Sequence, residues 1–251
     1  DCIPNMRVAD YIAKFLIANK VTDIFMLTGY GSMYMNDAIH VKKINHIAPR
    51  NEATAPVMAI GYSKVKDTIG VVCVTAGPGA SNALPGLAEA YVESAPVLII
   101  SGQVERKFTS SSRNLKLRTF GTAEINIIDF VKNHTKYSSF IDDPMLIRYE
   151  LEKALYHCIN GRPGPVWLDI PLDVQSSIID EKKLKNFIPP KSLNKHKENI
   201  TINKMLVALN RSKKPLFVFG HGVKSSKTFL DFYKIAKKHN IPYCFTRFSH
   251  D

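Results

Sequence analysis

The chain has 251 residues, of which 45% are hydrophobic and 22% charged, a composition typical of globular proteins that excludes a mostly disordered chain. Its formal net charge is +12, but the lysines and arginines are scattered along the sequence, so we expect no nucleic-acid partner. The four cysteines show no metal-ligand spacing, the first residues form no secretory leader, and the apolar runs are too short to cross a bilayer. We therefore expect a cytoplasmic protein without a membrane contact.

Helical and strand patterns alternate along residues 8–170. The predicted helices cover residues 8–18, 33–39, 52–64, 81–92 and 145–159. The predicted strands cover residues 22–27, 44–48, 69–74, 96–100 and 166–170. The run at 69–74 is apolar and largely β-branched, which is typical of a strand covered on both faces. The alternation predicts an α/β fold with a parallel sheet flanked by helices.

A linker and the start of a second α/β unit are predicted after this region. The linker is rich in lysine around a Pro-Pro pair, and helix and strand patterns resume from residue 202. About sixty residues are marginal for an independent α/β domain. We therefore expect a first domain at residues 1–179, a linker at 180–199 and an incomplete second domain at 200–251, in a chain that is the N-terminal part of a longer protein.

The strongest candidate for a ligand site combines Glu52 with the glycine-rich segment 75–82. Both follow predicted strands, and ligands of parallel sheets bind beyond the carboxyl ends of the strands. The segment matches neither the dinucleotide fingerprint nor the phosphate loop. Structural alternatives remain open at this point: Gly77-Pro78-Gly79 is also suited to a tight turn before a helix, and Glu52 to a helix N-terminus capped by Asn51.

Several segments together resemble the acetolactate synthase-like branch of the thiamine diphosphate enzymes. They occur in the order found in that family, and they are Glu52, Ala59-Ile60-Gly61-Tyr62, residues 75–82, residues 96–104 and residues 161–171. The resemblance covers residues 5–175, which it identifies as the pyrimidine-binding domain with the fold of that family. Residues 214–223 resemble the opening of the central domain of these enzymes.

The resemblance implies a role for each matching residue. Glu52 is the proton-relay residue, which hydrogen-bonds N1′ of the cofactor's aminopyrimidine and so favours the imino form that removes the thiazolium C2 proton. The implied contacts of the pyrimidine half of thiamine diphosphate are Thr28, Gly29, Glu52, Thr75, Pro78 and Asn82. The implied substrate contacts are Tyr30, Gln103, Phe120 and Gly121. Arg162 matches a position that touches FAD in acetolactate synthases, but a structural arginine beside a Pro-Gly-Pro turn fits equally, so FAD binding is left open.

Three residues depart from the acetolactate synthase pattern. Gly121 stands where a glutamine follows the phenylalanine, Leu172 stands where a lysine is usual, and Tyr30 stands in a paired-glycine position. The sequence at residues 25–29 and 120–127 is more similar to a sub-branch of the family associated with surface-glycan synthesis. The resemblance therefore implies a 2-keto acid donor such as pyruvate, with either a keto acid or a keto-sugar as acceptor.

The resemblance also implies a site shared between chains. Enzymes of this family bind Mg²⁺ and the cofactor's diphosphate through a domain with a Gly-Asp-Gly signature, which does not occur in these 251 residues. We therefore expect Mg²⁺ to bind through a domain outside this chain, self-association as a homodimer or tetramer, and no activity of the chain alone. A non-catalytic dimerisation or interaction module is the alternative function.

Overall fold

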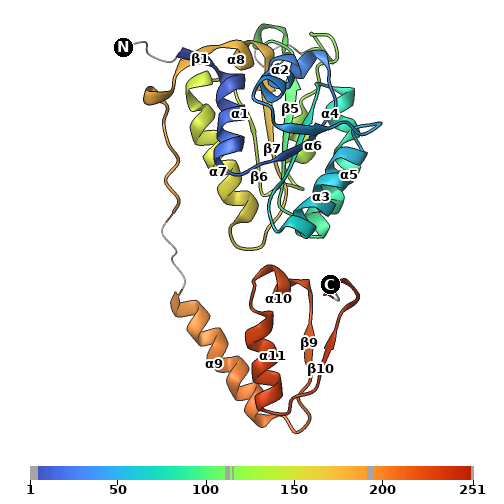
Figure 1. Cartoon of the computed structure of the whole chain (residues 1–251), viewed down its shortest axis with the longest axis vertical. Coiled ribbons are helices and arrows are strands. Elements are labelled where there is room, and N and C mark those ends of the chain that lie inside the picture. The colour runs from blue at the N-terminus through green and yellow to red at the C-terminus, as the bar shows by residue number, and fades with distance from the viewer. Residues whose placement is uncertain (1–4, 111–113, 115, 191–194, 250–251) are drawn as a thin grey trace. The chain divides into compact units, whose positions relative to one another are not determined.

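The computed structural model describes residues 5–110, 114, 116–190 and 195–249, which divide into two compact units, Asp1–Pro189 and Pro190–Asp251 (Figure 1). In the first unit, β1 (Asn5–Arg7) pairs antiparallel with β8 (Ile178–Asp180). This pairing makes residues beyond the expected boundary at 179 part of the first unit.

A six-stranded parallel sheet forms the centre of the first unit. Its strands are β2 (Asp23–Met26), β3 (Asn45–Ile47), β4 (Gly70–Val74), β5 (Val97–Gln103), β6 (Tyr137–Phe140) and β7 (Val166–Pro171). Their spatial order is β3-β2-β4-β5-β7-β6, and every neighbouring pair is parallel. The predicted α/β fold with a parallel sheet flanked by helices is therefore confirmed.

Helices cover both faces of this sheet (Figure 1). One face carries α1 (Val8–Ala18), α2 (Met33–Val41), α7 (Ile147–Ile159) and α8 (Leu172–Ser176). The other face carries α3 (Thr54–Lys66), α4 (Pro78–Asn82), α5 (Leu84–Val92) and α6 (Ile127–Val131). Along β4, Val71 and Cys73 pack on the first face, while Val72 and Val74 pack on the second. Burial on both faces explains the continuous apolar run in the sequence.

One predicted helix differs from the observed structure, and one observed strand was not predicted. In place of the single helix expected at 81–92, the structure has two helices, α4 and α5, which are separated at Ala83. The first of them, α4, begins three residues before the expected start. Proline near the start of each helix suits this division, because proline is tolerated in the first turn and not in the interior. The edge strand β6 was not predicted, because its Tyr-Ser-Ser-Phe sequence is only half-buried and lacks an apolar run.

The second unit is a small α/β arrangement. It contains α9 (Lys195–Arg211), β9 (Phe217–Phe219), α10 (His221–Ser225), α11 (Phe229–Lys238) and β10 (Tyr243–Phe245). The strands β9 and β10 pair in parallel. Phe219 is buried and its ring lies 5.7–6.3 Å from those of Phe229, Phe232, Tyr243 and Phe245. Aromatic packing therefore holds this unit together.

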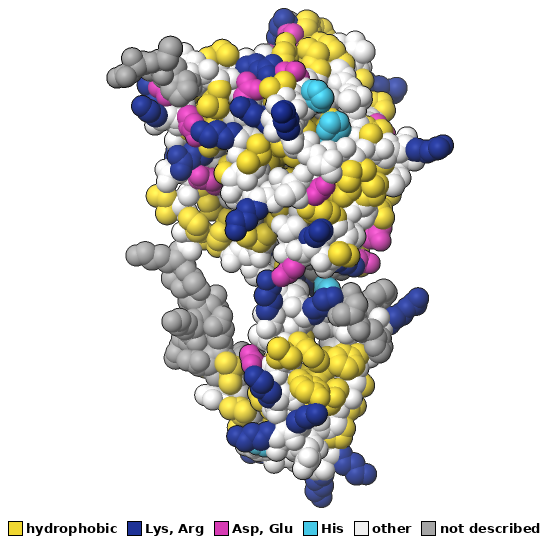
Figure 2. Space-filling model, viewed as in Figure 1, with side chains coloured by type: hydrophobic (Ala, Val, Ile, Leu, Met, Phe, Trp, Pro, Cys, Tyr) yellow, Lys and Arg dark blue, Asp and Glu magenta, His cyan; other side chains and the backbone are white. Residues whose placement is uncertain are grey.

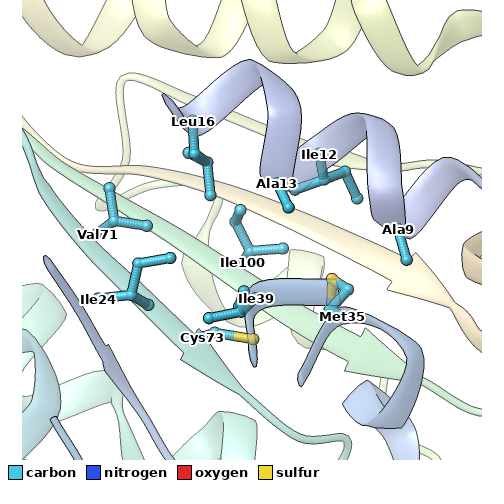
Figure 3. Close-up of a pocket in the computed structure, with 10 residues that line it drawn as sticks. All are labelled: Ala9, Ile12, Ala13, Leu16, Ile24, Met35, Ile39, Val71, Cys73 and Ile100. Carbon is cyan, nitrogen blue, oxygen red and sulfur yellow. The ribbon is translucent and has the colours of Figure 1, made fainter. Parts of the chain in front are cut away.

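A small apolar cavity lies in the core of the first unit, between the sheet and helices α1 and α2 (Figure 3). Its volume is about 10 Å³, and only apolar side chains line it, among them Leu16, Ile24 and Ile100. A cavity lined only by apolar side chains offers an ordered water no hydrogen-bond partners. It is therefore a packing defect of the core and not a ligand site.

The surface carries scattered basic side chains. Figure 2 shows lysines and arginines distributed over the displayed face of each unit, interspersed with acidic and apolar side chains. The scattering along the sequence therefore persists on this side of the surface. In the described parts of the chain, no helix combines the length and apolar character needed to cross a membrane.

Candidate active site

The carboxyl ends of β2 and β4 position the main candidate residues. The segment after β2 contains Thr28, which is exposed, and Gly29, and then continues into the 3-10 helix Tyr30–Ser32. The segment after β4 contains Thr75 and leads into α4. Because β2 and β4 are neighbours and parallel, these two segments meet at the same edge of the sheet.

Glu52 and Asn82 are in direct contact at this edge. The Asn82 side-chain amide donates a hydrogen bond of 2.8 Å to Glu52 Oε2. Glu52 lies in the turn before α3, which begins at Thr54, and the Asn51 side chain accepts a hydrogen bond of 3.1 Å from the Thr54 amide. The Glu52 carboxylate that accepts this bond is half-buried. The structure thus joins the two candidates that the sequence placed on separate segments.

Close packing against Thr75 explains why residue 29 is a glycine. A Cβ atom at Gly29 would overlap the Thr75 side chain. The amide of Gly31 donates a hydrogen bond of 3.0 Å to Thr75 Oγ1. A side chain at Gly29 would therefore push the segment after β2 away from Thr75 and break the contact between the two strand ends.

The turn from Gly77 to Gly79 also depends on the absence of side chains. Gly77 has φ of +59° and ψ of −120°, a conformation that L-residues avoid, and a Cβ there would overlap the carbonyl of Ala123. A Cβ at Gly79 would lie 2.5 Å from Thr75 Cγ2 and 3.3 Å from Glu52 Oε1. Between them, Pro78 begins α4 and is exposed. The turn therefore brings backbone, rather than side chains, next to the Glu52 carboxylate.

The residues expected to contact substrate lie in different environments. Tyr30 is 60% exposed and Phe120 is 41% exposed. The Phe120 ring lies 6.3 Å from the Phe108 ring, and a Cβ at Gly121 would approach the Phe108 carbonyl at 2.7 Å. Phe120 and Gly121 thus pack with the residues that follow β5, whereas Tyr30 follows β2. The role of these three residues as substrate contacts stays a prediction.

Gln103 is buried inside a polar network at the end of β5. Its side-chain amide donates to the Ile125 carbonyl at 2.9 Å and to Asp169 Oδ2 at 3.2 Å, and its Oε1 accepts from the Val104 amide at 3.0 Å. Gln103 is only 2% exposed. These contacts give Gln103 a structural task, and its predicted substrate contact stays a prediction.

The centre of this network is Asp169, which the sequence analysis did not single out. Ser101 Oγ donates to Asp169 Oδ1 at 2.6 Å and accepts from Trp167 Nε1 at 2.8 Å. Burial raises the pKa of Asp169 to about 7, and the hydrogen bonds from Ser101 and Gln103 only partly offset it. A charged residue inside the apolar run Val166–Pro171 was the signal that could have revealed it.

Glu124 is a second buried carboxylate that the sequence analysis missed. It accepts hydrogen bonds from the Ser110 amide and hydroxyl and from the Phe120 amide. Burial raises the pKa of Glu124, but these hydrogen bonds and one from Gly121 outweigh it, so the pKa lies below the usual value for a glutamate. Its partners are distant in sequence or on the backbone, so no local motif identifies it.

Arg162 lies at the opposite edge of the sheet from Glu52. It precedes β7, and its Nε donates a hydrogen bond of 2.6 Å to Ser94 Oγ just before β5. The strands are parallel, so these amino ends are remote from the carboxyl ends where Glu52 and Asn82 meet. Arg162 lines a surface pocket with Tyr91, Val92 and Lys136. It is therefore not part of the Glu52 site, and its flavin contact stays a prediction.

The fold and the site define a class of protein. A parallel α/β sheet presents a carboxylate, an amide and a side-chain-free turn at its carboxyl edge, the position at which α/β domains in general bind small ligands. No cluster of three or more potential metal ligands occurs among the described histidines, cysteines, aspartates and glutamates.

Comparison with known proteins specifies the family. Residues 6–130 match the family described as the thiamine pyrophosphate enzyme, N-terminal TPP binding domain. The chain is 34% identical over 242 residues to an acetolactate synthase large subunit from Buchnera aphidicola, covering 93% of this chain and 40% of that protein. It is 33% identical over 221 residues to the acetolactate synthase large subunit of Lactococcus lactis, covering 87% of this chain and 37% of that protein.

These similarities identify the chain as a member of the thiamine pyrophosphate enzymes, with their N-terminal TPP binding domain at residues 6–130. The similarity to acetolactate synthase large subunits extends over most of the chain. A tobacco relative, acetolactate synthase 2 of the chloroplast, is 29% identical over 224 residues. The chain spans about two fifths of the length of the bacterial relatives named above.

Proposed function

We propose that this chain supplies the aminopyrimidine side of a thiamine diphosphate site, in an enzyme that decarboxylates a 2-keto acid and transfers the acyl unit to a carbonyl acceptor. The observation that carries the proposal is the Asn82–Glu52 hydrogen bond of 2.8 Å beside the Gly77–Gly79 turn. The similarity to acetolactate synthase large subunits supports the reaction class.

The residues at this site suit an aminopyrimidine ring. Asn82 donates its hydrogen bond to Oε2 of Glu52. The other oxygen, Oε1, faces Gly79, where no side chain intervenes. A half-buried carboxylate can accept a hydrogen bond from a protonated ring nitrogen and hold that proton. Thr28, Gly29, Thr75 and Pro78 would form the wall around the ring. Bound thiamine diphosphate would supply a carbon nucleophile and store the electron pair released with CO₂.

The remaining parts of the enzyme belong to the same proposal. Mg²⁺ and the diphosphate would be held by another domain, in a cytoplasmic homodimer or tetramer whose subunits share the site. Pyruvate is the proposed acyl donor, and the acceptor is either a second keto acid or a keto-sugar. Incubation with labelled pyruvate alone tests the first acceptor, because it would yield acetolactate. Flavin absorbance of the purified protein tests whether FAD binds near Arg162.

The test replaces Glu52 by Gln in the protein expressed from its natural reading frame. Glutamine keeps the size of the side chain and cannot hold the proton, so pyruvate consumption and C2–H exchange of thiamine diphosphate should fall by about 10²–10⁴-fold. Glu89→Gln is the matched control, because Glu89 is an exposed carboxylate on α5 and should leave both rates unchanged.

Two results would contradict the proposal. Full activity of Glu52→Gln would show that this carboxylate has no proton to relay. A wild-type protein that self-associates but neither exchanges the C2 proton nor consumes any 2-keto acid would instead support a non-catalytic interaction module.

A further inference from the structure

Glu124 holds the two ends of one loop together outside the Glu52 site. Its Oε1 accepts hydrogen bonds of 2.6 Å from the Ser110 amide and 2.7 Å from the Ser110 hydroxyl. Its Oε2 accepts a hydrogen bond of 2.8 Å from the Phe120 amide. The side chain is only 6% exposed. Hydrogen bonds to a carboxylate are stronger than those between neutral groups, so this contact fixes the outgoing residue Ser110 against the returning residue Phe120.

The same loop rests on the glycine-rich turn of the Glu52 site. Ala123, the residue before Glu124, has φ of +61°, and its carbonyl lies where a Cβ of Gly77 would be. On the other side of Glu124, the Ile125 carbonyl accepts a hydrogen bond of 2.9 Å from buried Gln103. Both neighbours of Glu124 are therefore held in place: Ala123 contacts the turn beside Glu52, and Ile125 is hydrogen-bonded to the sheet.

We propose that Glu124 is a positioning residue, which holds the loop so that Phe120 and the Ala123 backbone, which lies against the Gly77 turn, form the binding surface for the 2-keto acid. The inference rests on the proposed function. Glu124 itself acts through the Phe120 amide, and nothing in its geometry brings it to Glu52. Its loss should therefore affect substrate affinity more than the affinity for thiamine diphosphate.

The experiment compares three variants of the protein expressed from its natural reading frame. Glu124→Ala removes the acceptors, and Glu124→Gln keeps the size and one acceptor oxygen in case the alanine variant folds poorly. Glu105→Ala is the matched control, since Glu105 is a carboxylate at the base of the same loop that pairs with the exposed Lys107. Amide exchange at Phe120, measured by hydrogen–deuterium exchange without substrate, reports on the loop directly.

We expect the Phe120 amide to exchange about tenfold faster in Glu124→Ala, with an intermediate rate in Glu124→Gln and no change in Glu105→Ala. We also expect the KM for pyruvate to rise about tenfold in Glu124→Ala, while the affinity for thiamine diphosphate with Mg²⁺ changes less than about twofold.

Unchanged exchange at Phe120 in Glu124→Ala would overturn the proposal, because the carboxylate would not hold the loop. Faster exchange with an unchanged KM would also overturn it, because the loop would not serve the substrate. A wild-type protein that consumes no 2-keto acid would refute the proposed function and with it the substrate role, whereas the exchange result would still decide whether Glu124 holds the loop.

Discussion

The side-chain amide of Asn82 donates a hydrogen bond to Glu52 Oε2 across 30 positions of sequence. Glu52 precedes α3 and Asn82 ends α4, and both helices pack on the same face of the sheet. The two side chains are therefore held by neighbouring elements of the core, which fixes their separation before any ligand binds. Such preorganisation is what a cofactor site requires, because ordering side chains on binding would cost affinity.

Replacement of Asn82 by Asp should weaken cofactor binding. The change would set two carboxylates against each other at hydrogen-bonding distance, so that one of them would take up a proton. We expect the affinity for thiamine diphosphate to fall at least about tenfold, since a hydrogen bond to a charged group contributes about 1.5–3 kcal/mol. Isothermal titration calorimetry with Mg²⁺, on the protein expressed from its natural reading frame, measures this.

Ser81→Ala is the control for Asn82→Asp. Ser81 lies on the same helix, and its hydroxyl donates to the Pro78 carbonyl at 3.1 Å without contacting Glu52. Wild-type affinity in Asn82→Asp would show that the observed pair is not part of the cofactor site.

The sequence predicted the central sheet because its buried strands are apolar on both faces. This pattern found β4, β5 and β7 directly, whereas the half-buried edge strand β6 and the β1–β8 pair have no comparable run. Edge strands depend on pairing with a strand that is distant in sequence, and the local hydrophobic pattern does not predict such pairing.

The candidate site was predictable only in part, for the same reason. Glu52 and Asn82 follow elements that the sequence revealed, so their meeting at the carboxyl edge could be anticipated. The roles of Asp169 and Glu124 depend on hydrogen bonds from residues 66–68 and 4–14 positions away. Only the folded chain brings these donors to the two carboxylates.

Replacement of Gly77 by Ala should destabilise the fold strongly. The new Cβ would face both an unfavourable backbone conformation at φ of +59° and an overlap with the Ala123 carbonyl. We expect a loss of about 2–5 kcal/mol in the free energy of unfolding, as the sum of backbone strain and overpacking. Urea denaturation measures this loss.

Gly161→Ala separates the two causes in Gly77→Ala. Gly161 has φ of +67°, but nothing lies within 4 Å of a Cβ there. Its replacement should therefore cost only about 1–2 kcal/mol, which is the penalty of the left-handed conformation. Equal losses in the two variants would show that the Ala123 contact contributes nothing.

Asp169 should make stability depend on pH. Its pKa is about 7 in the folded protein, against 3.8 for an ordinary aspartate, so the folded state binds a proton that the unfolded state has released. The contribution of Asp169 to the free energy of unfolding is therefore largest below about pH 4. This contribution falls by up to about 4 kcal/mol as the pH rises to 7. Urea denaturation between pH 4 and 8 checks this.

Asp169→Asn should flatten that dependence, because an amide cannot ionise. The difference in stability between variant and wild type should shift in favour of the variant as pH rises from 4 to 7. Asp129→Asn is the control, since Asp129 is exposed and paired with Lys132. A parallel pH dependence of Asp169→Asn and wild type would contradict the raised pKa.

Replacement of Gly79 by Ala should affect cofactor binding more than folding. The new Cβ would lie 2.5 Å from Thr75 Cγ2 and 3.3 Å from Glu52 Oε1. Overpacking costs about 1–3 kcal/mol, but alanine regains about 1 kcal/mol of helix propensity over glycine in α4. The methyl group would still occupy the space beside Oε1, so we expect the affinity for thiamine diphosphate to fall at least about tenfold.

The double variant Gly79→Ala with Thr75→Ser tests which contact matters. Serine lacks the Cγ2 methyl and keeps the hydroxyl that accepts from the Gly31 amide, so it should restore most of the stability measured by urea denaturation. Cofactor affinity, measured by calorimetry, should remain low because the alanine methyl still lies beside Glu52. Recovery of wild-type affinity in the double variant would instead assign the effect to Thr75 and remove Glu52 Oε1 from the binding surface.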